Sequence, residues 1–396
     1  MNIGVIDLAS GGWTAGGVFS SLVAEALQLR RDESDTVSLV SAKEEPSDLP
    51  RIRPRRARYG RGEYFLRKLT GHLKPARLPF TADEHGLDVL LPVIYPTAEE
   101  DIAPRGRCAS IGWIPDFQHA RLPEFFDPGE IENRKEGCRR CARWNDLVLL
   151  SSESVRRDFE KELPQFAAKA RVLPFPSSLA LSDLPETATD FRIRLGVPEK
   201  YLLVANQFWA HKNHDVVIQA MSDLRRRGHP ARVVFVGNMF DHRNSEQCVA
   251  STVLQSLSRH DLGQNVRMLG RVSHADLVSL LRHAGAVLQP SRFEGWSTTV
   301  QDAKALGRPL ICSDIPTHRE QAPQASFFPV DDYQKLAEVM AGNWETLDFS
   351  YQEAKERMAL EDERKAVALY GDALWKLCRE ARDVRDRDFG GTAVGE

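Results

Sequence analysis

Short apolar runs alternate with longer amphipathic stretches along most of the chain. The runs form two series, at residues 3–9, 36–42, 87–93, 109–114, 147–152 and 171–176, and at 201–207, 232–238, 266–272, 286–291, 309–314 and 326–330. Buried runs of this length separated by helical periodicity are typical of parallel strands joined by crossover helices. The pattern therefore predicts an α/β protein with two doubly wound, Rossmann-like sheets that face each other.

Proline, serine and charged residues interrupt this pattern between the two series, which places a domain boundary near residue 180. We predict an N-terminal domain at 1–178, a C-terminal domain at 179–350, amphipathic helices at 351–385 that pack back towards the N-terminal domain, and a flexible tail at 386–396. Ligands of open parallel sheets bind beyond the carboxyl ends of the strands, so the cleft between the domains is the predicted site.

Composition excludes some classes of protein. The 396 residues include 53 basic and 56 acidic side chains, a formal net charge of −3 that indicates no nucleic-acid partner. The chain starts without a signal-peptide pattern and has no run of 18 apolar residues, so we expect a cytoplasmic protein. Six scattered cysteines do not form a disulfide framework, and the Cys138–Cys141 pair lacks the second half of a zinc site.

Two carboxylates flank a predicted helix start in the stretch 290–314. Ser297, Thr298 or Thr299 can cap this helix, and the exposed N–H groups at 297–299 would bind an anion such as a diphosphate. Glu294 before the helix and Asp302 within it could accept hydrogen bonds from hydroxyl groups, for example of a sugar and a ribose. A capped surface helix with solvated carboxylates explains the same residue types equally well.

Further candidates follow other predicted strands. Lys212 comes after the strand at 201–207, where it could neutralise a phosphate, although a solvated surface lysine is the ordinary alternative. Gly16 and Gly17 begin a helix after the first strand and let a ligand approach the backbone, without the dinucleotide fingerprint. Asp116 and His119 follow the fourth strand, so they should point into the cleft; a structural role is the commoner one for such a histidine.

One segment is strongly basic. Residues 51–77 contain ten lysines or arginines and a single acidic residue. The segment could contact an anionic membrane at its inner face or bind a phosphorylated acceptor, and a solvated basic surface is an equal alternative. If the membrane hypothesis holds, a lipid-linked acceptor follows.

Four motifs together resemble a known family. The stretch FEGWSTTVQD at 293–302 resembles the E-x7-E motif of family-four retaining glycosyltransferases, with Asp302 in place of the second Glu. Residues 206–214 and 314–321 resemble the accompanying donor-domain motifs, and residues 113–119 resemble the acceptor-domain motif. The resemblance covers most of residues 1–330. It implies a GT-B fold and retaining transfer of a sugar from a nucleoside-diphosphate sugar to an acceptor hydroxyl in polysaccharide, glycolipid or glycosylated-metabolite biosynthesis.

The resemblance also implies domain and residue roles. The domain at 1–178 would be the acceptor-side domain, and the domain at 179–350 would bind the nucleotide-sugar. Glu294 would hold donor-sugar hydroxyls, Asp302 the ribose and Lys212 the diphosphate, and Asp116 and His119 are candidates for acceptor or donor-sugar contact. The implied catalytic residues are Glu294, Lys212, His119 and Asp116, and the implied donor-binding residues are Gly16, Gly17, Asn206, Lys212, Gly295, Trp296, Ser297, Thr298, Thr299 and Asp302. The family commonly has an arginine about six residues before its lysine, where this chain has Asn206 and Gln207, so Arg292 or Arg319 could add charge. Backbone groups near 268–271 would contact the base.

We expect no cofactor and no metal, because the nucleotide-sugar is a substrate and no D-x-D triad appears where a divalent metal would bridge the phosphates. Fixed amides and Lys212 would stabilise the leaving diphosphate, which would take the acceptor proton. A nucleotide-sugar epimerase, or a phosphorolytic transferase, on the same scaffold is the alternative among enzymes. A catalytically silent nucleotide-sugar-binding protein is the alternative from another class, since a fold does not prove turnover. The sugar, base, acceptor, linkage and oligomeric state stay open.

Overall fold

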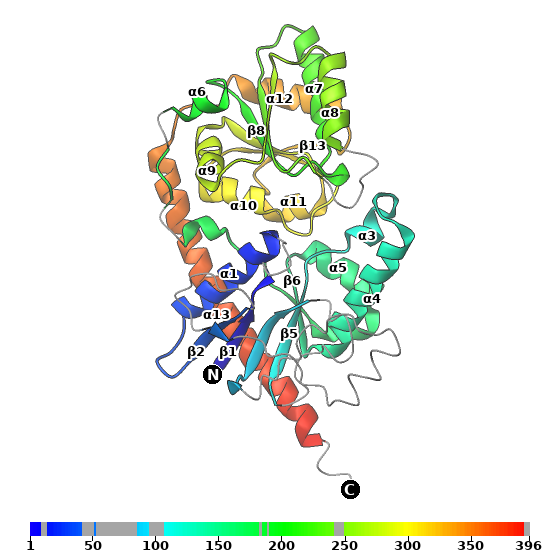
Figure 1. Ribbon diagram of the computed structural model, residues 1–396, viewed down its shortest axis with the longest axis vertical. Helices are drawn as coiled ribbons and strands as arrows, with labels where there is room; N and C mark the ends of the chain where they lie inside the picture. Colours follow the sequence, from blue (N-terminus) through cyan, green and yellow to red (C-terminus); the bar gives the residue numbers. More distant parts are fainter. Residues whose placement is uncertain are drawn as a thin grey trace, which may run out of the picture.

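A computed structural model describes residues 1–8, 14–41, 51–52, 85–94, 107–181, 184–187, 190–240 and 249–391. The chain forms two α/β domains that face each other, with the N-terminal domain below the C-terminal one in Figure 1. Most of the basic segment 51–77 lies outside the described residues. The two facing α/β sheets predicted from the apolar runs are confirmed.

Both sheets are parallel throughout their paired strands. The N-terminal sheet has the order β3 (Arg51–Ile52), β2 (Thr36–Val40), β1 (Asn2–Ile6), β4 (Val89–Val93), β5 (Ala109–Ile114), β6 (Leu147–Leu150) and β7 (Ala170–Val172). The C-terminal sheet has the order β10 (Val266–Gly270), β9 (Val233–Val236), β8 (Leu202–Ala205), β11 (Ala286–Gln289), β12 (Leu310–Ser313) and β13 (Ser326–Phe328). Every predicted strand is present, and β3 is an additional one at the edge.

Most helices belong to one of the two domains, and one long helix runs along both. The N-terminal domain contains α1 (Thr14–Leu29), α3 (Gln118–Arg121), α4 (Pro128–Trp144) and α5 (Glu153–Glu162), with 3-10 turns η4 (Pro123–Phe125) and η5 (Pro164–Lys169). The C-terminal domain contains α6 (Phe191–Leu195), α7 (His214–Arg226), α8 (Val249–Arg259), α9 (His274–His283), α10 (Thr298–Ala305), α11 (Pro316–Gln321) and α12 (Tyr333–Trp344), with η7 (Ala210–Lys212). Turn η6 (Ser178–Ala180) lies in the segment that connects the two sheets.

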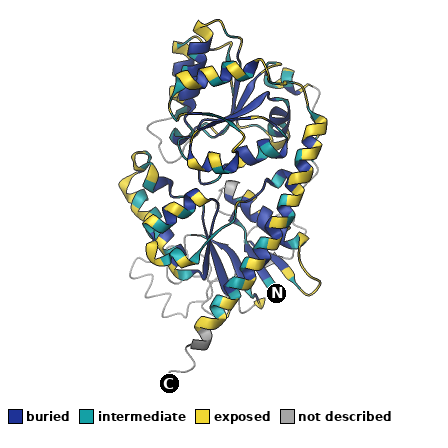
Figure 2. Ribbon diagram, turned by 180° about the vertical axis from the view of Figure 1, so that it is seen from behind, coloured by how far each residue is buried: buried dark blue, intermediate teal, exposed yellow. Residues whose placement is uncertain are grey.

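Helix α13 (Glu353–Gly391) is a single helix that follows one side of both domains (Figure 1). Leu374 and Trp375 on this helix belong to the core of the N-terminal domain, and the Trp375 indole N–H donates to the Leu27 carbonyl at 2.9 Å. The outward face of the helix is largely exposed (Figure 2). We predicted several helices and a flexible tail from residue 386; the structure has one helix, and residues 386–391 are helical.

Apolar strand residues explain why helices cover both faces of each sheet. Strands such as β5 and β6 are buried along their whole length, which is expected where helices cover both faces of a parallel sheet. The dark, buried strands in the middle of both domains are visible in Figure 2. No helix among the described residues has the length and apolar character that crossing a membrane requires.

Candidate active site

The strand order brings the candidate residues Lys212 and Glu294 together. In the C-terminal sheet, β8 and β11 are neighbours although they are far apart in sequence, so their carboxyl ends meet at a topological switch point. Lys212 ends the turn η7 that follows β8, and Asn213 then takes a left-handed conformation (φ 54°) before α7 begins. Glu294 lies in the loop that follows β11.

Lys212 and Glu294 form an ion pair in this position. The Lys212 Nζ atom lies 2.6 Å from Glu294 Oε1, and their side chains are only 15% and 8% exposed. Gln289 adds a second donor, because its Nε2 atom lies 2.9 Å from the same carboxylate oxygen. Gln289 Oε1 in turn accepts a hydrogen bond from Asn206 Nδ2 at 2.9 Å. A buried network therefore joins the ends of β8 and β11.

The network keeps Glu294 charged. Burial alone would raise the pKa of the Glu294 carboxyl, but Lys212, His318 and Ser291 favour the charged form and hold this pKa below its usual value. The backbone of the same residue is fixed as well, since the Thr317 hydroxyl donates to the Glu294 carbonyl at 2.7 Å. Glu294 is therefore a preorganised carboxylate.

Helix α10 begins as predicted but with fewer available amides. The Ser297 hydroxyl accepts a hydrogen bond from the Val300 N–H at 3.3 Å and caps the helix. The Ser297 N–H donates to Gln321 Oε1 at 3.1 Å, and Gln321 Nε2 donates back to the Ser297 carbonyl at 2.7 Å. We predicted a three-amide anion site at 297–299; because Gln321 takes the first amide, only Thr298 and Thr299 remain candidates for it.

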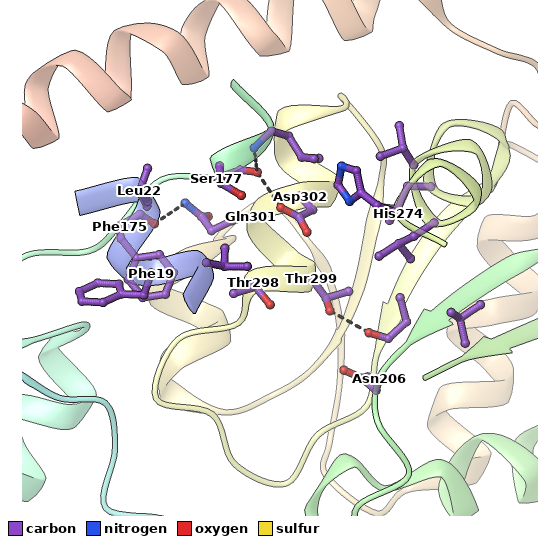
Figure 3. Close-up of a pocket in the computed structure, with 18 of the residues that line it drawn as sticks. Phe19, Leu22, Phe175, Ser177, Asn206, His274, Thr298, Thr299, Gln301 and Asp302 are labelled. Atoms are coloured by element: carbon purple, nitrogen blue, oxygen red, sulfur yellow. Dashed lines mark hydrogen bonds between the residues drawn. The ribbon is translucent and has the colours of Figure 1, made fainter. Parts of the chain in front are cut away.

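A cavity of about 350 Å³ adjoins this helix start and lies between the domains (Figure 3). Helix α10 contributes Thr298, Thr299 and Asp302, and Asn206 lines the cavity at the end of β8. Apolar side chains from α1, α9 and the connecting segment form most of the remaining wall, namely Val18, Phe19, Leu22, Phe175, Leu179, Leu277, Val278 and Leu281. Few polar groups on an apolar wall are typical of a small-molecule site.

Asp302 faces the cavity and is tied to the segment that connects the domains. The Ser177 hydroxyl donates to Asp302 Oδ1 at 2.6 Å, and the Ser177 N–H donates to Glu363 on α13. Desolvation raises the pKa of Asp302 to about 6; the Ser177 hydrogen bond opposes this shift and the nearby Glu363 charge adds to it. Asp302 is therefore a carboxylate that titrates close to neutral pH.

The N-terminal domain meets the Glu294 loop through its backbone. A Cβ atom on Gly295 would lie 2.1 Å from the Pro115 carbonyl oxygen and 2.9 Å from Asp116 Cβ, so only glycine fits this contact. We expected Gly295 for a tight turn; the structure shows that the close approach of the two domains requires it. Asp116 therefore lies directly beside the Glu294 loop, and its Oδ1 accepts a hydrogen bond from the Gln118 N–H at 2.8 Å.

His119 is placed differently from Asp116. The residue is 2% exposed, and its ring lies beside that of Phe117, with ring centroids 6.0 Å apart. Desolvation, assisted by the positive charge of Arg134, lowers the pKa of His119 to about 4. The ring is therefore neutral near pH 7, and as positioned it does not reach the cavity. Its predicted contact with a substrate stays a prediction.

The remaining donor-side candidates surround the cavity without lining it. Gly16 and Gly17 are in the first turn of α1, where their carbonyls accept hydrogen bonds from the Ser20 hydroxyl at 3.0 and 3.2 Å. The following residues, Val18 and Phe19, line the cavity instead. The Trp296 indole N–H donates to the Phe175 carbonyl at 2.9 Å, which fixes the connecting segment beside the cavity wall.

Two arginines that could have added charge have other partners. Arg292 pairs with Asp331 at 2.8 Å, and Arg319 pairs with Asp314 at 2.7 Å. Among the residues that the structure describes, no group of three or more His, Cys, Asp or Glu side chains could hold a metal ion. Cys138 and Cys141 are both buried on α4.

Several residues of the site were not predicted from the sequence. Gln289 ends a buried strand, and a polar residue at the carboxyl end of β11 was a usable signal. Ser177 and Phe175 belong to the segment between the domains, which we had interpreted only as a boundary. Glu363 lies on α13, and its approach to Ser177 depends on tertiary packing that no local pattern reports.

Comparisons with known proteins find similar sequences and similar folds. Residues 186–348 match the family model described as "Glycosyl transferases group 1". A curated relative, alpha-D-kanosaminyltransferase of Streptomyces kanamyceticus, is 22% identical over 45% of this chain and 45% of its own length. The chain spans about half the length of the curated relatives it matches.

Solved structures show the same fold over nearly the whole chain. Sucrose-phosphate synthase of Thermosynechococcus elongatus superposes with a TM-score of 0.65 at 16% identity, covering 96% of this chain and 98% of its own. Alr3699/HepE of Anabaena, solved in complex with UDP and glucose, gives a TM-score of 0.64 at 16% identity and covers 96% of this chain and 100% of its own. The fold is the predicted GT-B fold, and the C-terminal domain matches the group 1 glycosyltransferase model.

Proposed function

We propose that this protein is a retaining glycosyltransferase that moves a sugar from a nucleoside diphosphate to an acceptor hydroxyl. The observation that supports this most is the ion pair between half-buried Lys212 and buried Glu294 after β8 and β11, beside an interdomain cavity that also contains Asp302. A half-buried cation next to a helix start suits a diphosphate, and buried carboxylates suit hydroxyl groups. The proposal includes assignment to family four, retention of the anomeric configuration and the roles of the individual residues.

In the proposed arrangement, the nucleoside occupies the cavity between α1, α9 and α10. Asp302 accepts a hydrogen bond from the ribose, and the apolar wall contacts the base and the ribose ring. The diphosphate lies towards the Thr298 and Thr299 amides and the Lys212 ammonium, where a fixed positive field stabilises the charge that develops on leaving. Glu294 accepts hydrogen bonds from the donor sugar.

The proposed reaction breaks the bond between the sugar anomeric carbon and the diphosphate oxygen and forms a bond to the acceptor oxygen on the same face. The acceptor proton moves to the leaving diphosphate. Asp116 lies next to the Glu294 loop on the acceptor-side domain, which makes it the candidate for acceptor contact. The acceptor itself, and any contact of the basic segment with a membrane, are not specified by this proposal.

Thermal unfolding with UDP, GDP, ADP and dTDP, each with and without EDTA, tests the donor site. We expect one nucleotide to raise the melting temperature with or without EDTA, with about 2.7 kcal/mol of stabilisation at a hundredfold excess over its dissociation constant. Lys212→Ala should lose this shift. The matched control is Lys335→Ala on α12, which removes an exposed lysine paired only within its own domain. UDP is the first choice, because the Anabaena neighbour was solved with UDP and glucose.

Turnover is tested with the sugar donors of the nucleotide that binds. Transfer or slow donor hydrolysis that disappears in Glu294→Ala supports the proposal. Binding without turnover would support the silent nucleotide-sugar-binding protein, and interconversion of free nucleotide-sugars would support the epimerase. If no nucleotide shifts the transition, the donor-site proposal is wrong.

A further inference from the structure

Helix α11 of the C-terminal domain supplies a cap to a helix of the N-terminal domain. The Glu320 carboxylate accepts hydrogen bonds from the Glu153 N–H, at 2.9 and 3.1 Å to its two oxygens, and from the Ser154 N–H at 3.4 Å. These are the first two amides of α5. A carboxylate at a helix N-terminus is stabilised both by the hydrogen bonds and by the helix dipole.

The other amides of this helix start are satisfied within the N-terminal domain. The Ser152 hydroxyl accepts from the Val155 N–H at 3.1 Å, and the Ser152 carbonyl accepts from the Arg156 N–H at 3.0 Å. Glu320 therefore completes a cap that the N-terminal domain leaves unfinished. Separation of the domains would remove the partner of two amides and of one carboxylate at once.

The same short helix is bound to the proposed donor loop. Thr317 on α11 donates to the Glu294 carbonyl, and Gln321 is hydrogen-bonded to both the N–H and the carbonyl of Ser297. Within six residues, α11 thus contacts the loop on one side and the opposite domain on the other. Figure 1 shows α11 and α5 facing each other across the domain interface, away from the long α13 on the outer side.

We propose that Glu320 is a positioning residue that latches the two domains in the closed arrangement and couples this closure to the Glu294–Ser297 loop. The inference rests on the proposed function for its catalytic consequence, but the latch itself does not. With α13 and the connecting segment on one side, the Glu320 contact holds the other side of the cleft. Closure in turn places Asp116 beside the loop through the Gly295 contact.

Hydrogen exchange at the start of α5 tests the latch directly. In Glu320→Ala we expect the Glu153 and Ser154 amides to exchange about ten- to a hundredfold faster, as expected for the loss of charge-assisted hydrogen bonds. The Val155 amide should change less, because Ser152 still caps it. Glu320→Gln keeps an acceptor without the charge and should give an intermediate effect. The matched control, Glu338→Gln, alters an exposed glutamate that pairs within α12 and should change nothing.

Two further readouts separate a latch from a local cap. Small-angle scattering should give a larger radius of gyration for Glu320→Ala, with a melting temperature near that of the wild type. In a transfer assay, kcat/KM for the acceptor should fall while the nucleotide dissociation constant stays nearly constant. Unchanged exchange at Glu153 and Ser154, or an unchanged radius of gyration with faster exchange, would overturn the latch. If the alanine variant does not fold, the exchange and scattering of Glu320→Gln decide the question.

The outcome is independent of whether the protein transfers sugars. Exchange and scattering are measured without a nucleotide, so they succeed or fail on the domain contact alone. A nucleotide panel that gives no shift would refute the proposed function and leave the latch standing. A normal nucleotide shift with no effect of Glu320→Ala on exchange would refute the latch and leave the function standing.

Discussion

Replacement of Lys212 by methionine would remove the ammonium that faces Glu294 and keep most of the apolar stem. Glu294 is 8% exposed in its side chain, and its nearest cation is Lys212 at 2.6 Å. Removing one partner of a buried ion pair costs about 3–5 kcal/mol because it leaves a buried charge without compensation. We expect Lys212→Met to lower the free energy of unfolding by about 3 kcal/mol, the lower end of that range, since Gln289 still donates to the carboxylate.

The stability difference between Lys212→Met and the wild type should depend on pH. In the wild type the pKa of Glu294 is held below its usual value, so its contribution to stability is complete above the unfolded-state pKa and is lost as pH falls through the folded-state pKa. In Lys212→Met, burial raises this pKa, so the charged carboxyl costs stability at neutral pH and the cost shrinks on acidification. The deficit of the variant should therefore be larger at about pH 7 than at about pH 5.

Urea unfolding at the two pH values, followed by tryptophan fluorescence, measures this difference. The double variant Lys212→Met/Glu294→Gln removes the unpaired charge and should recover most of the loss; measured with the single variant Glu294→Gln, it completes a double-mutant cycle. A loss of less than about 1 kcal/mol that is equal at both pH values, with no recovery in the double variant, would refute a buried and coupled pair. Glu338→Gln is the control for a surface charge.

Three other perturbations follow from the same structure. Because the pKa of Asp302 is raised to about 6, nucleotide affinity should fall as pH drops through this value, and Asp302→Asn should bind more weakly with no such pH step; calorimetric titration measures both. Gly295→Ala puts a Cβ 2.1 Å from the Pro115 carbonyl, so scattering should show a less compact molecule, whereas an unchanged profile would contradict the close contact. Leu374→Ala on α13 should cost about 2–5 kcal/mol in thermal or urea unfolding, since this fully buried side chain belongs to the N-terminal core; a loss under about 1 kcal/mol would contradict that packing.

Local patterns predicted the sheets well because a strand that is buried on both faces is a continuous apolar run in the sequence. The runs at 109–114 and 147–152 correspond to β5 and β6, whose residues are all buried. The capping serine of α10 was also predictable, because a short polar side chain before a helix satisfies a free amide. β3 was missed: a two-residue edge strand at Arg51–Ile52 has no apolar alternation to detect.

Contacts between distant segments were not predictable from such patterns. The Lys212–Glu294 pair required the strand order, in which β8 and β11 are neighbours. The occupation of the Ser297 amide by Gln321 depends on where α11 packs, so the sequence pattern could not show that this amide already has a partner. The polar tail expected from residue 386 is partly helix, because α13 extends to Gly391 despite its charged composition.

The segment between the sheets links the cleft to the long helix. Ser177 binds Asp302 through its hydroxyl and Glu363 through its amide, so the same residue contacts α10 and α13. The Phe175 carbonyl accepts hydrogen bonds from Trp296 and from Gln301 Nε2, at 2.9 and 3.1 Å. This side of the cleft is therefore held by buried and part-buried hydrogen bonds, whereas the opposite side is held by the more exposed Glu320 contact. Since an exposed contact costs less to break than a buried one, opening of the cleft should begin on the Glu320 side.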